Sequence, residues 1–203
     1  MNTKKSDYES LFEKAIMSAD EGEYQKAIDS FKKVIEMKPD LFEAWHYLGT
    51  VYDEMGEYEE ALINMKKALE LNNDYIDAWI DISFVYIRME NFLEALDCLK
   101  KALELDEFNY EIWYDIGYTH YALNEHEKAI DCYNKALELT DRKDIDSLYN
   151  LACSLSILNK KKEAIEVLEE AIKLDPKIIE EIIEDTDFNN IVEEEAFKKL
   201  IKV

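Results

Sequence analysis

The stretch from Phe42 to Tyr75 reads FEAWHYLGTVYDEMGEYEEALINMKKALELNNDY, and it recurs with drift once upstream and three times downstream. A tryptophan column repeats every 34 residues, at Trp45, Trp79 and Trp113. An alanine column keeps the same interval, at Ala61, Ala95 and Ala129. A fixed period of this size predicts an array of stacked structural repeats.

The two columns divide the chain into a short N-terminal tail, five repeat windows and a C-terminal segment. The fifth window is displaced by one residue, because Leu148 follows Trp113 by 35 residues. The predicted boundaries are 1–7 for the tail, 8–41, 42–75, 76–109, 110–143 and 145–178 for the repeats, and 179–203 for the segment that follows.

Within a window the apolar residues have helical spacing. In 42–75 a first helix is predicted from residues at i, i+3, i+4 and i+7, which are Trp45, Leu48, Gly49 and Tyr52. A second helix follows Gly56, which suits a left-handed helix stop. Small residues let the two helices approach closely; these are Gly49, Ala61 and Ala68. Each window is therefore predicted to be a helix-turn-helix unit.

The composition supports helices and limits the classes of partner. Hydrophobic residues make up 48% of the chain, with only 4 Gly and 2 Pro, which disfavours a loop-rich β fold. The net charge of −23 repels nucleic acid and anionic membranes. There is no signal-like or membrane-spanning apolar run, so three reduced cysteines in a cytoplasmic protein are expected.

The repeat resembles the tetratricopeptide repeat over about 8–178. The residues that carry the resemblance are Pro39, Trp45, Leu48, Gly49, Tyr52, Ala61 and Ala68. Leu11 and Ser18 depart from the pattern in the first window, and His120 departs from it in the fourth. The resemblance implies an all-α, right-handed superhelical solenoid of about five helix-turn-helix repeats plus C-terminal capping helices. It also implies a non-catalytic protein-interaction module.

The period stops after Pro176, where a different pattern begins. An amphipathic helix is predicted from Ile178, Ile179, Ile182 and Ile183. Asp185-Thr186-Asp187 is predicted to cap the element that follows it, and the DFNNI and AFKKLI segments resemble the closing segment found after such repeats. An array needs an element that covers its last apolar face, so this segment is predicted to be a cap.

The inner surface of such a solenoid is lined by the first helices and is the candidate binding groove. We expect the packing stripe to lie on the opposite side, so that the aromatic residues of the groove are free to bind a partner. Apolar residues rimmed by acids favour a peptide or helix with apolar or aromatic anchors and basic residues. The predicted groove residues are Phe12, His46, Tyr47, Asp77, Ile80, Asp81, Phe84, Glu111, Tyr114, Asp115, Tyr118, Tyr121 and Tyr149.

Some members of the family grip a C-terminal carboxylate with Lys and Asn, but the corresponding positions here hold Phe12, Ile16, Tyr47, Asp77 and Asp81. An acidic chaperone tail is therefore a poor candidate partner. Two alternatives are a bare scaffold face, and a homo-oligomer in which the C-terminal segment packs on another copy through Phe188, Phe197 and Leu200.

Catalysis is not expected. The sequence has no Gly-rich phosphate loop, nucleophile elbow or His-Glu zinc pattern. The three histidines are too scattered for a metal site, and no metal or other cofactor is expected.

Overall fold

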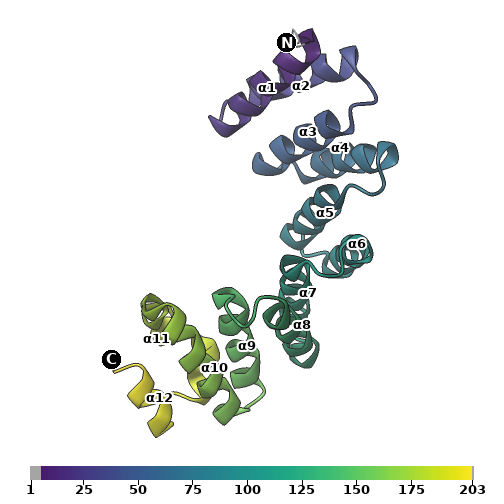
Figure 1. Ribbon diagram of the computed structural model, residues 1–203. Coiled ribbons are helices and arrows are strands. Elements are labelled where there is room, and N and C mark those ends of the chain that lie inside the picture. Colours follow the sequence, from purple (N-terminus) through teal and green to yellow (C-terminus); the bar gives the residue numbers. More distant parts are fainter. Residues whose placement is uncertain (1–5, 203) are drawn as a thin grey trace. The chain divides into compact units, whose positions relative to one another are not determined.

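The computed structural model describes residues 6–202 (Figure 1). The predicted tail at 1–7 lies mostly outside the described residues. Helices connected by short turns make up the described chain, which contains no β-strand between residues 6 and 202. The predicted all-α class is confirmed. The chain divides into two compact units, one ending at Leu105 and one beginning at Asp106. We call them unit 1 and unit 2.

Unit 1 consists of three helix pairs. Its helices are α1 (Asp7–Asp20), α2 (Tyr24–Met37), α3 (Phe42–Glu54), α4 (Tyr58–Leu71), α5 (Ile76–Arg88) and α6 (Phe92–Leu105). The two helices of each pair pack against each other, and the first helices contact one another in sequence, α1 with α3 and α3 with α5 (Figure 1). This contact brings the predicted groove residues of α1, α3 and α5 onto neighbouring helices.

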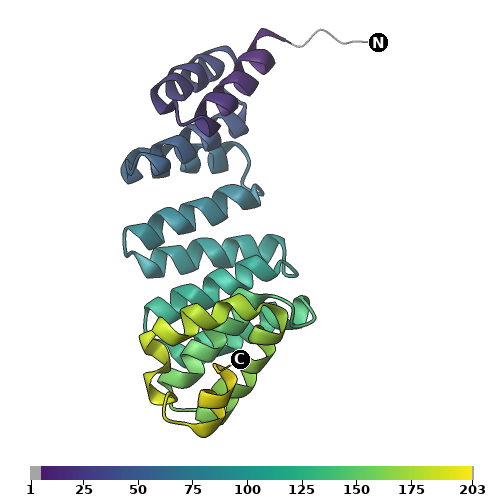
Figure 2. The ribbon, with the colours of Figure 1, turned by 90° about the vertical axis from the view of Figure 1, so that its left-hand side faces the viewer.

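Unit 2 consists of two helix pairs and a C-terminal segment. Its elements are α7 (Tyr110–Ala122), α8 (His126–Leu139), α9 (Ile145–Ile157), α10 (Lys161–Leu174), η1 (Pro176–Ile178), α11 (Ile179–Glu184), η2 (Thr186–Asn190) and α12 (Glu195–Leu200). The C-terminal segment from η1 to α12 folds back, so that η2 packs on α9 while η1 and α12 pack on α10 (Figure 2). The predicted helix around Ile178–Ile183 is shorter than expected, because its first residues form the 3-10 turn η1.

The turns inside the five pairs share one backbone feature. The residue two places after each first helix has a positive φ, and glycine relieves the strain of this conformation in the first two turns. The five residues are Gly22 (74°), Gly56 (76°), Glu90 (59°), Asn124 (59°) and Asn159 (58°). The predicted left-handed stop at Gly56 is confirmed.

Two further glycines allow a close approach of helices. A Cβ on Gly49 would lie 2.6 Å from Cγ of Met65, and a Cβ on Gly117 would lie 2.7 Å from Cε1 of Tyr133. Each glycine thus leaves room for a large side chain of the second helix in its own pair. The close packing predicted for Gly49 is confirmed.

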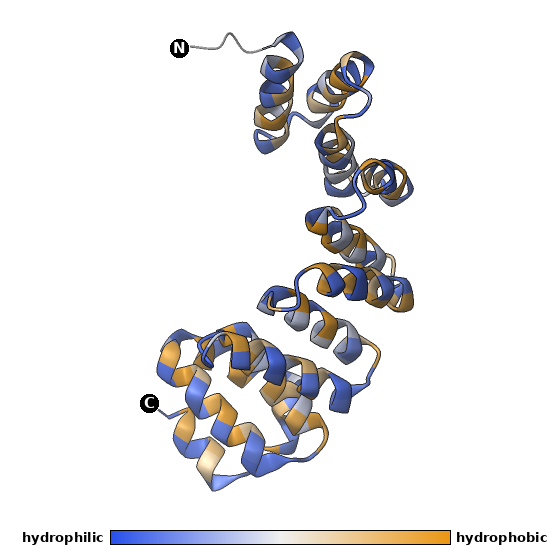
Figure 3. Ribbon diagram, turned by 45° about the vertical axis from the view of Figure 1, so that its right-hand side comes forward, coloured by the Kyte–Doolittle hydropathy of each residue, from blue (hydrophilic) through white to orange (hydrophobic). Residues whose placement is uncertain are grey.

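Every helix carries both hydrophobic and hydrophilic residues along its length (Figure 3), as helices packed on one side require. Unit 1 has a cluster around Phe31 and a second around Met65. The cluster of unit 2 extends from Ala129 to Phe197, so the C-terminal segment belongs to the same core as α8, α9 and α10. Among the described helices, none has the length and apolar character needed to cross a membrane.

Candidate functional site

The thirteen predicted groove residues are divided between the two units. Unit 1 holds Phe12, His46, Tyr47, Asp77, Ile80, Asp81 and Phe84. Unit 2 holds Glu111, Tyr114, Asp115, Tyr118, Tyr121 and Tyr149. All of them lie on the first helices of their pairs. We call the side of α1, α3 and α5 that carries the first set the unit 1 face, and the side of α7 and α9 that carries the second set the unit 2 face.

One end of the unit 1 face is aromatic. The ring of Phe12 meets that of Tyr47 edge to face, with 5.5 Å between centroids, and Tyr47 also stacks on Phe31 at 6.0 Å. Phe12 and Tyr47 are both half-buried. These rings join α1 to α3 and still offer part of their surface to a partner.

His46 lies beneath the middle of this face rather than on it. It is only 5% exposed. Its Nε2 is 2.7 Å from Oδ2 of Asp81, and its Nδ1 is 3.0 Å from the hydroxyl of Tyr75. His46 therefore links α3 to α5 through Asp81, a supporting role that leaves little of its ring accessible.

The other end of the face, on α5, is apolar. Ile80 and Phe84 are half-buried, and neither belongs to the packed clusters of unit 1. Asp77 is exposed, one turn before Ile80 and two turns before Phe84. This combination of an incompletely covered apolar strip and an adjacent acid has the composition expected of a binding surface.

Two carboxylate oxygens on α3 are buried without a hydrogen-bond donor among the described residues. They are Oε2 of Glu43 and Oδ1 of Asp53. The second oxygen of Asp53 accepts a hydrogen bond from Nη1 of Arg88, so that side chain is only half satisfied. A buried carboxylate oxygen without a donor is energetically unfavourable, by about 1–3 kcal/mol or more. Because both atoms have almost no accessible surface, a partner would act on these two acids through their negative charge and not by a hydrogen bond to the buried oxygens.

The unit 2 face is different, because the chain's own C-terminal segment covers part of it. The hydroxyl of Tyr149 donates to Oδ2 of Asp185 at 2.7 Å, and the hydroxyl of Tyr121 donates to Oδ2 of Asp187. Ser156 Oγ donates to the backbone oxygen of Asp187 at 2.6 Å. We call residues 185–188 the C-terminal turn. Its two carboxylates and its backbone are held by hydroxyls of α7 and α9.

An aromatic anchor completes this contact. Phe188 is fully buried, and its ring meets that of Tyr149 edge to face at 5.7 Å. Phe197 is 1% exposed and lies 6.4 Å from Phe188, while Leu200 packs against the same core. The residues that would carry the C-terminal segment onto another copy are thus used within the chain, where the segment acts as a cap.

The prediction that the aromatic groove residues have no packing role is wrong for three tyrosines of this face, and it is also wrong for Phe12 and Tyr47 of unit 1, which pack against the cluster around Phe31. The partly buried side chains of Tyr114, Tyr121 and Tyr149 pack against the unit 2 core. Tyr114 also accepts a hydrogen bond from Nδ2 of Asn150 at 3.1 Å. Burial, followed by the neighbouring Asp146, raises the pKa of Tyr114 to about 12. Its hydroxyl is therefore a neutral part of the packing at physiological pH.

Three other residues of the unit 2 face differ from these tyrosines. Tyr118 is 42% exposed, and Glu111 is exposed as well. Asp115 is 8% exposed, and its carboxylate has no hydrogen-bond or ion-pair partner among the described residues, although its backbone oxygen accepts from Oγ1 of Thr119 at 2.7 Å. Burial, followed by the charge of Glu111 one turn earlier, raises the pKa of Asp115 to about 7. Tyr118 is therefore the most accessible aromatic residue of this face.

A thiol and two carboxylates come together under the C-terminal turn. Donor atoms of Cys153, Asp185 and Asp187 all lie within 4.8 Å of one another. Burial first, and then the two carboxylates, raise the pKa of Cys153 well above its usual range, and its Sγ lies 3.7 Å from Oδ2 of Asp185 as a donor. A protonated thiol is a poor metal ligand, so this group is best described as a hydrogen-bonded cluster. Cys98 and Cys132 are also free and buried.

Sequence reasoning did not foresee the partners of Tyr121 and Tyr149. Asp185 was expected to cap the next element, and this is confirmed, since its Oδ1 accepts from the backbone N–H of Asp187 at 2.9 Å. The same two aspartates also turn their remaining oxygens toward the tyrosines. Nothing in the spacing from Tyr149 to Asp185 signals that contact.

Helix pairs with small residues at the crossing, a regular period and a C-terminal cap define a class of helical repeat proteins. Family models described as tetratricopeptide repeat match residues 40–107, 74–142 and 109–177, and one described as TPR repeat matches residues 18–56. The chain belongs to the tetratricopeptide repeat family. Proteins of this family are generally non-catalytic interaction modules, and protein interaction is the class of function that the repeats support.

Solved structures with the same fold have low sequence identity to this chain. MamA (41-end) from Desulfovibrio magneticus RS-1 is 19% identical with a TM-score of 0.76, and the match covers 85% of this chain and 97% of that one. Another crystal structure of MamA is 21% identical with a TM-score of 0.74, covering 85% and 94%. YrrB, described as a TPR protein with an unusual peptide-binding site, is 23% identical with a TM-score of 0.68, covering 82% and 85%. No curated protein matches the chain.

Proposed function

We propose that this chain is a non-catalytic adaptor or assembly scaffold, and that its unit 1 face binds a peptide or helix with apolar anchors and basic side chains. The observation that carries the proposal is the pair of donorless carboxylate oxygens on α3, at Glu43 and Asp53. A lysine or arginine side chain supplies a compensating positive charge.

The distance between the two acids indicates the spacing of the basic residues in a partner. Glu43 and Asp53 are 10 residues apart on one helix, which corresponds to about 15 Å along its axis. An extended peptide covers this distance in roughly four to five residues. We therefore propose two basic residues at about that separation, with apolar side chains between them that reach Ile80, Phe84 or Tyr47.

Two further properties support a basic partner. The net charge of −23 attracts cationic segments over long range. The half-buried Phe12, Tyr47, Ile80 and Phe84 offer apolar area on the same face. That YrrB has a peptide-binding site also supports a peptide ligand for a chain of this fold.

The proposal is tested by titrating the full chain with fluorescent peptides that carry two lysines or arginines four or five residues apart. Acidic peptides of the same length and apolar content serve as the comparison. The double variant Glu43→Gln, Asp53→Asn keeps the shape of both side chains and removes their charges. We expect it to weaken binding of the basic peptides by about tenfold or more, which equals about 1.4 kcal/mol.

A matched control removes two charges from the exposed side of the second helices, with Glu59→Gln on α4 and Glu94→Gln on α6. It changes the net charge equally and should leave the affinity within about twofold, since exposed charges at a distance are screened. Preference for the acidic peptides, or an equal loss in the control, would overturn the proposal.

A further inference from the structure

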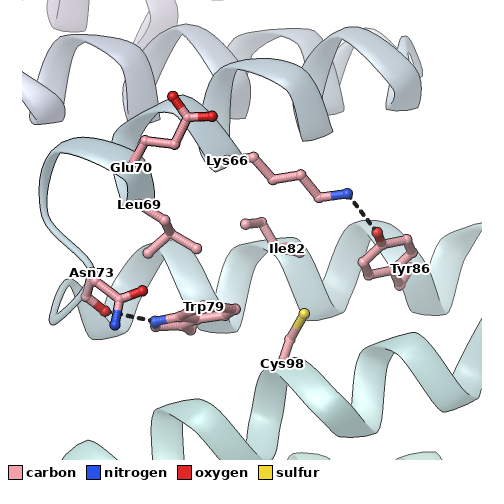
Figure 4. Close-up of a pocket in the computed structure, with 8 residues that line it drawn as sticks. All are labelled: Lys66, Leu69, Glu70, Asn73, Trp79, Ile82, Tyr86 and Cys98. Carbon is pink, nitrogen blue, oxygen red and sulfur yellow. Dashed lines mark hydrogen bonds between the residues drawn. The ribbon is translucent and has the colours of Figure 1, made fainter.

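A second apolar surface of unit 1 lies away from the first-helix face, between α4, α5 and α6 (Figure 4). The pocket has a volume of about 370 Å³. Its wall is formed by Lys66, Leu69, Glu70, Asn73, Trp79, Ile82, Tyr86 and Cys98. We call it the α4–α6 pocket. Its volume is at the lower end of the range for ligand sites, roughly 300–1,000 Å³, and suits one large side chain with its neighbours.

The two ends of the pocket are fixed by hydrogen bonds, which Figure 4 shows as dashed lines. At one end Nε1 of Trp79 donates to the backbone oxygen of Asn73 at 2.9 Å. At the other end Nζ of Lys66 donates to the hydroxyl of Tyr86 at 2.8 Å and lies 5.3 Å from the centroid of that ring. The pocket is thus held open between a rigid indole and a cation, with apolar side chains between them.

The charge of Lys66 has no carboxylate partner among the described residues. Its neighbour Lys67, by contrast, pairs with Glu70 at 2.6 Å. Several other lysines of the second helices also pair with an acid one turn away, as Lys101 does with Glu104 at 2.7 Å. An ammonium group beside an apolar pocket, and held only by a phenol, favours a ligand that carries a negative charge next to an apolar group.

The equivalent cleft in unit 2 lacks these properties. It lies between α8, α9 and α10 and measures about 260 Å³. The repeat alignment places Asn134 where unit 1 has Lys66, and Val167 where it has Cys98. An ion pair of 2.7 Å between Arg142 and Glu170, both of which line the cleft, crosses from one side to the other. The cationic apolar pocket is therefore specific to unit 1 and is not a requirement of the fold.

Phe108 is an exposed aromatic residue for which the fold gives no packing role. It is 72% exposed, the largest exposed fraction among the large hydrophobic side chains. The same turn position in the two preceding repeats holds Asp40 and Asp74. The turn fixes its backbone, since the N–H of Phe108 donates to Oδ1 of Asp106 at 3.2 Å. Phe108 follows two acids, Asp106 and Glu107, so an aromatic ring and negative charge are presented together.

We propose that the α4–α6 pocket binds the Phe108 turn of a second copy of this chain. The ring of Phe108 would leave water for the apolar wall formed by Leu69, Trp79 and Ile82. Glu107 would bring a carboxylate to the unpaired ammonium of Lys66. The choice of a second copy rests on this complementarity of charge and on an exposed aromatic side chain that has no packing role in its own chain.

The geometry of this contact is heterologous, because the two partners use different surfaces. Each copy offers one Phe108 turn and one pocket, so the association extends head to tail or closes into a ring. The net charge of −23 opposes contact between copies. At physiological ionic strength, where charges are screened beyond about 8 Å, the local contact can outweigh that repulsion.

The test measures the mass of the full chain by analytical ultracentrifugation over a concentration series, without any peptide. It is thus independent of the unit 1 face and of the function proposed for it. We expect the mean mass to rise with concentration. Phe108→Ala should weaken the association by about tenfold or more, as loss of a buried aromatic anchor does. Leu93→Ala is the matched control, since Leu93 is 68% exposed on α6 and should be neutral.

Two pocket variants test the other half of the contact. Cys98→Phe fills the pocket, and Lys66→Glu reverses its charge without changing the apolar wall, so the second remains informative if the first fails to fold. Tested alone, each pocket variant should self-associate as weakly as Phe108→Ala does. A mixture of Phe108→Ala with either pocket variant should form dimers and nothing larger, because one intact turn and one intact pocket remain.

The proposal is overturned by a wild-type chain that stays monomeric throughout the series. It is equally overturned if self-association survives both Phe108→Ala and Lys66→Glu, or if the mixture of complementary variants stays monomeric.

Discussion

The faces of unit 1 and unit 2 are built on the same kind of helix pair, yet only the unit 2 face is partly covered by the C-terminal segment. On the unit 1 face, Ile80 and Phe84 are half-buried outside the packed clusters. On the unit 2 face, Tyr121 and Tyr149 donate to aspartates of the C-terminal turn. The comparison shows that an aromatic residue on a first helix does not by itself mark a binding site, because the same position can serve a partner or a cap.

A second difference concerns equivalent aspartates. Asp81 of unit 1 and Asp115 of unit 2 stand 34 residues apart at the same place in their repeats. Oδ2 of Asp81 lies 2.7 Å from Nε2 of His46, whereas the carboxylate of Asp115 has no hydrogen-bond or ion-pair partner among the described residues. The repeat thus fixes where an acid lies, and whether its carboxylate has a partner is a separate property of each position.

The largest expected effect comes from removing the anchor of the cap. Phe188→Ala leaves a cavity in the unit 2 core and should destabilise that unit by about 3–5 kcal/mol. Hydrogen exchange of the full chain measures this, with protection lost in α9 and α10 and kept in α1 to α4. Phe84→Ala is the matched variant on the uncovered face and should cost less than about 1 kcal/mol. Equal losses would show that the two faces do not differ.

The next effect is a pH dependence that only one of the equivalent aspartates should show. The pKa of Asp115 is raised from 3.8 to about 7 in the folded chain, so the folded state holds its proton more tightly than the unfolded state. Its contribution to stability is complete below the unfolded value and is lost as the pH rises to about 7. Asp115→Asn should therefore stabilise the chain at about pH 8, by about 2–4 kcal/mol, and change little near pH 4.

Chemical denaturation at several pH values measures this effect. Asp81→Asn is the comparison, because it removes the negative charge that faces His46 and should destabilise the chain. A gain in stability from Asp81→Asn, or a stability of Asp115→Asn that changes with pH as the wild type does, would contradict the assignment.

The smallest expected effects come from replacing the two glycines at which paired helices approach closely, Gly117 and Gly49. A Cβ at residue 117 would lie 2.7 and 2.8 Å from two ring atoms of the buried Tyr133, which cannot bend away. Gly117→Ala should cost about 1–3 kcal/mol. A Cβ at residue 49 would lie 2.6 Å from Cγ of Met65 and also 3.0 and 3.1 Å from two backbone atoms of α4, Ala61 O and Met65 N. Because a helix backbone moves aside less readily than a side chain, Gly49→Ala should destabilise the chain at least as much as Gly117→Ala. Thermal unfolding measures both, and a clearly smaller loss for Gly49→Ala would contradict this order.

The fold was predictable because its signals are local and repeated. The tryptophan and alanine columns placed the helix pairs, and Gly56 and Pro176 marked a turn and a helix end from their own backbone limits. Trp79 illustrates how regular the repeat is, since its Nε1 donates to a carbonyl six residues earlier, as do Trp45 and Trp113.

The sites were less predictable, because they depend on contacts distant in sequence. His46 looked like a surface residue from its helical position, but Tyr75 and Asp81 draw it inward. Tyr149 has the sequence position of a groove residue, but its hydroxyl donates to the carboxylate of Asp185, 36 residues later. The division into two units also had no signal, since the period runs unbroken across residue 105.

The row of left-handed turn residues has a practical consequence for experiments on this chain. Gly22, Gly56, Glu90, Asn124 and Asn159 are all exposed, one in each helix pair. Glu90 already holds a long side chain in that conformation. A cysteine introduced at residue 90, 124 or 159 would carry a fluorophore or spin probe that reports on a single pair, while both first-helix faces and the α4–α6 pocket keep their native side chains.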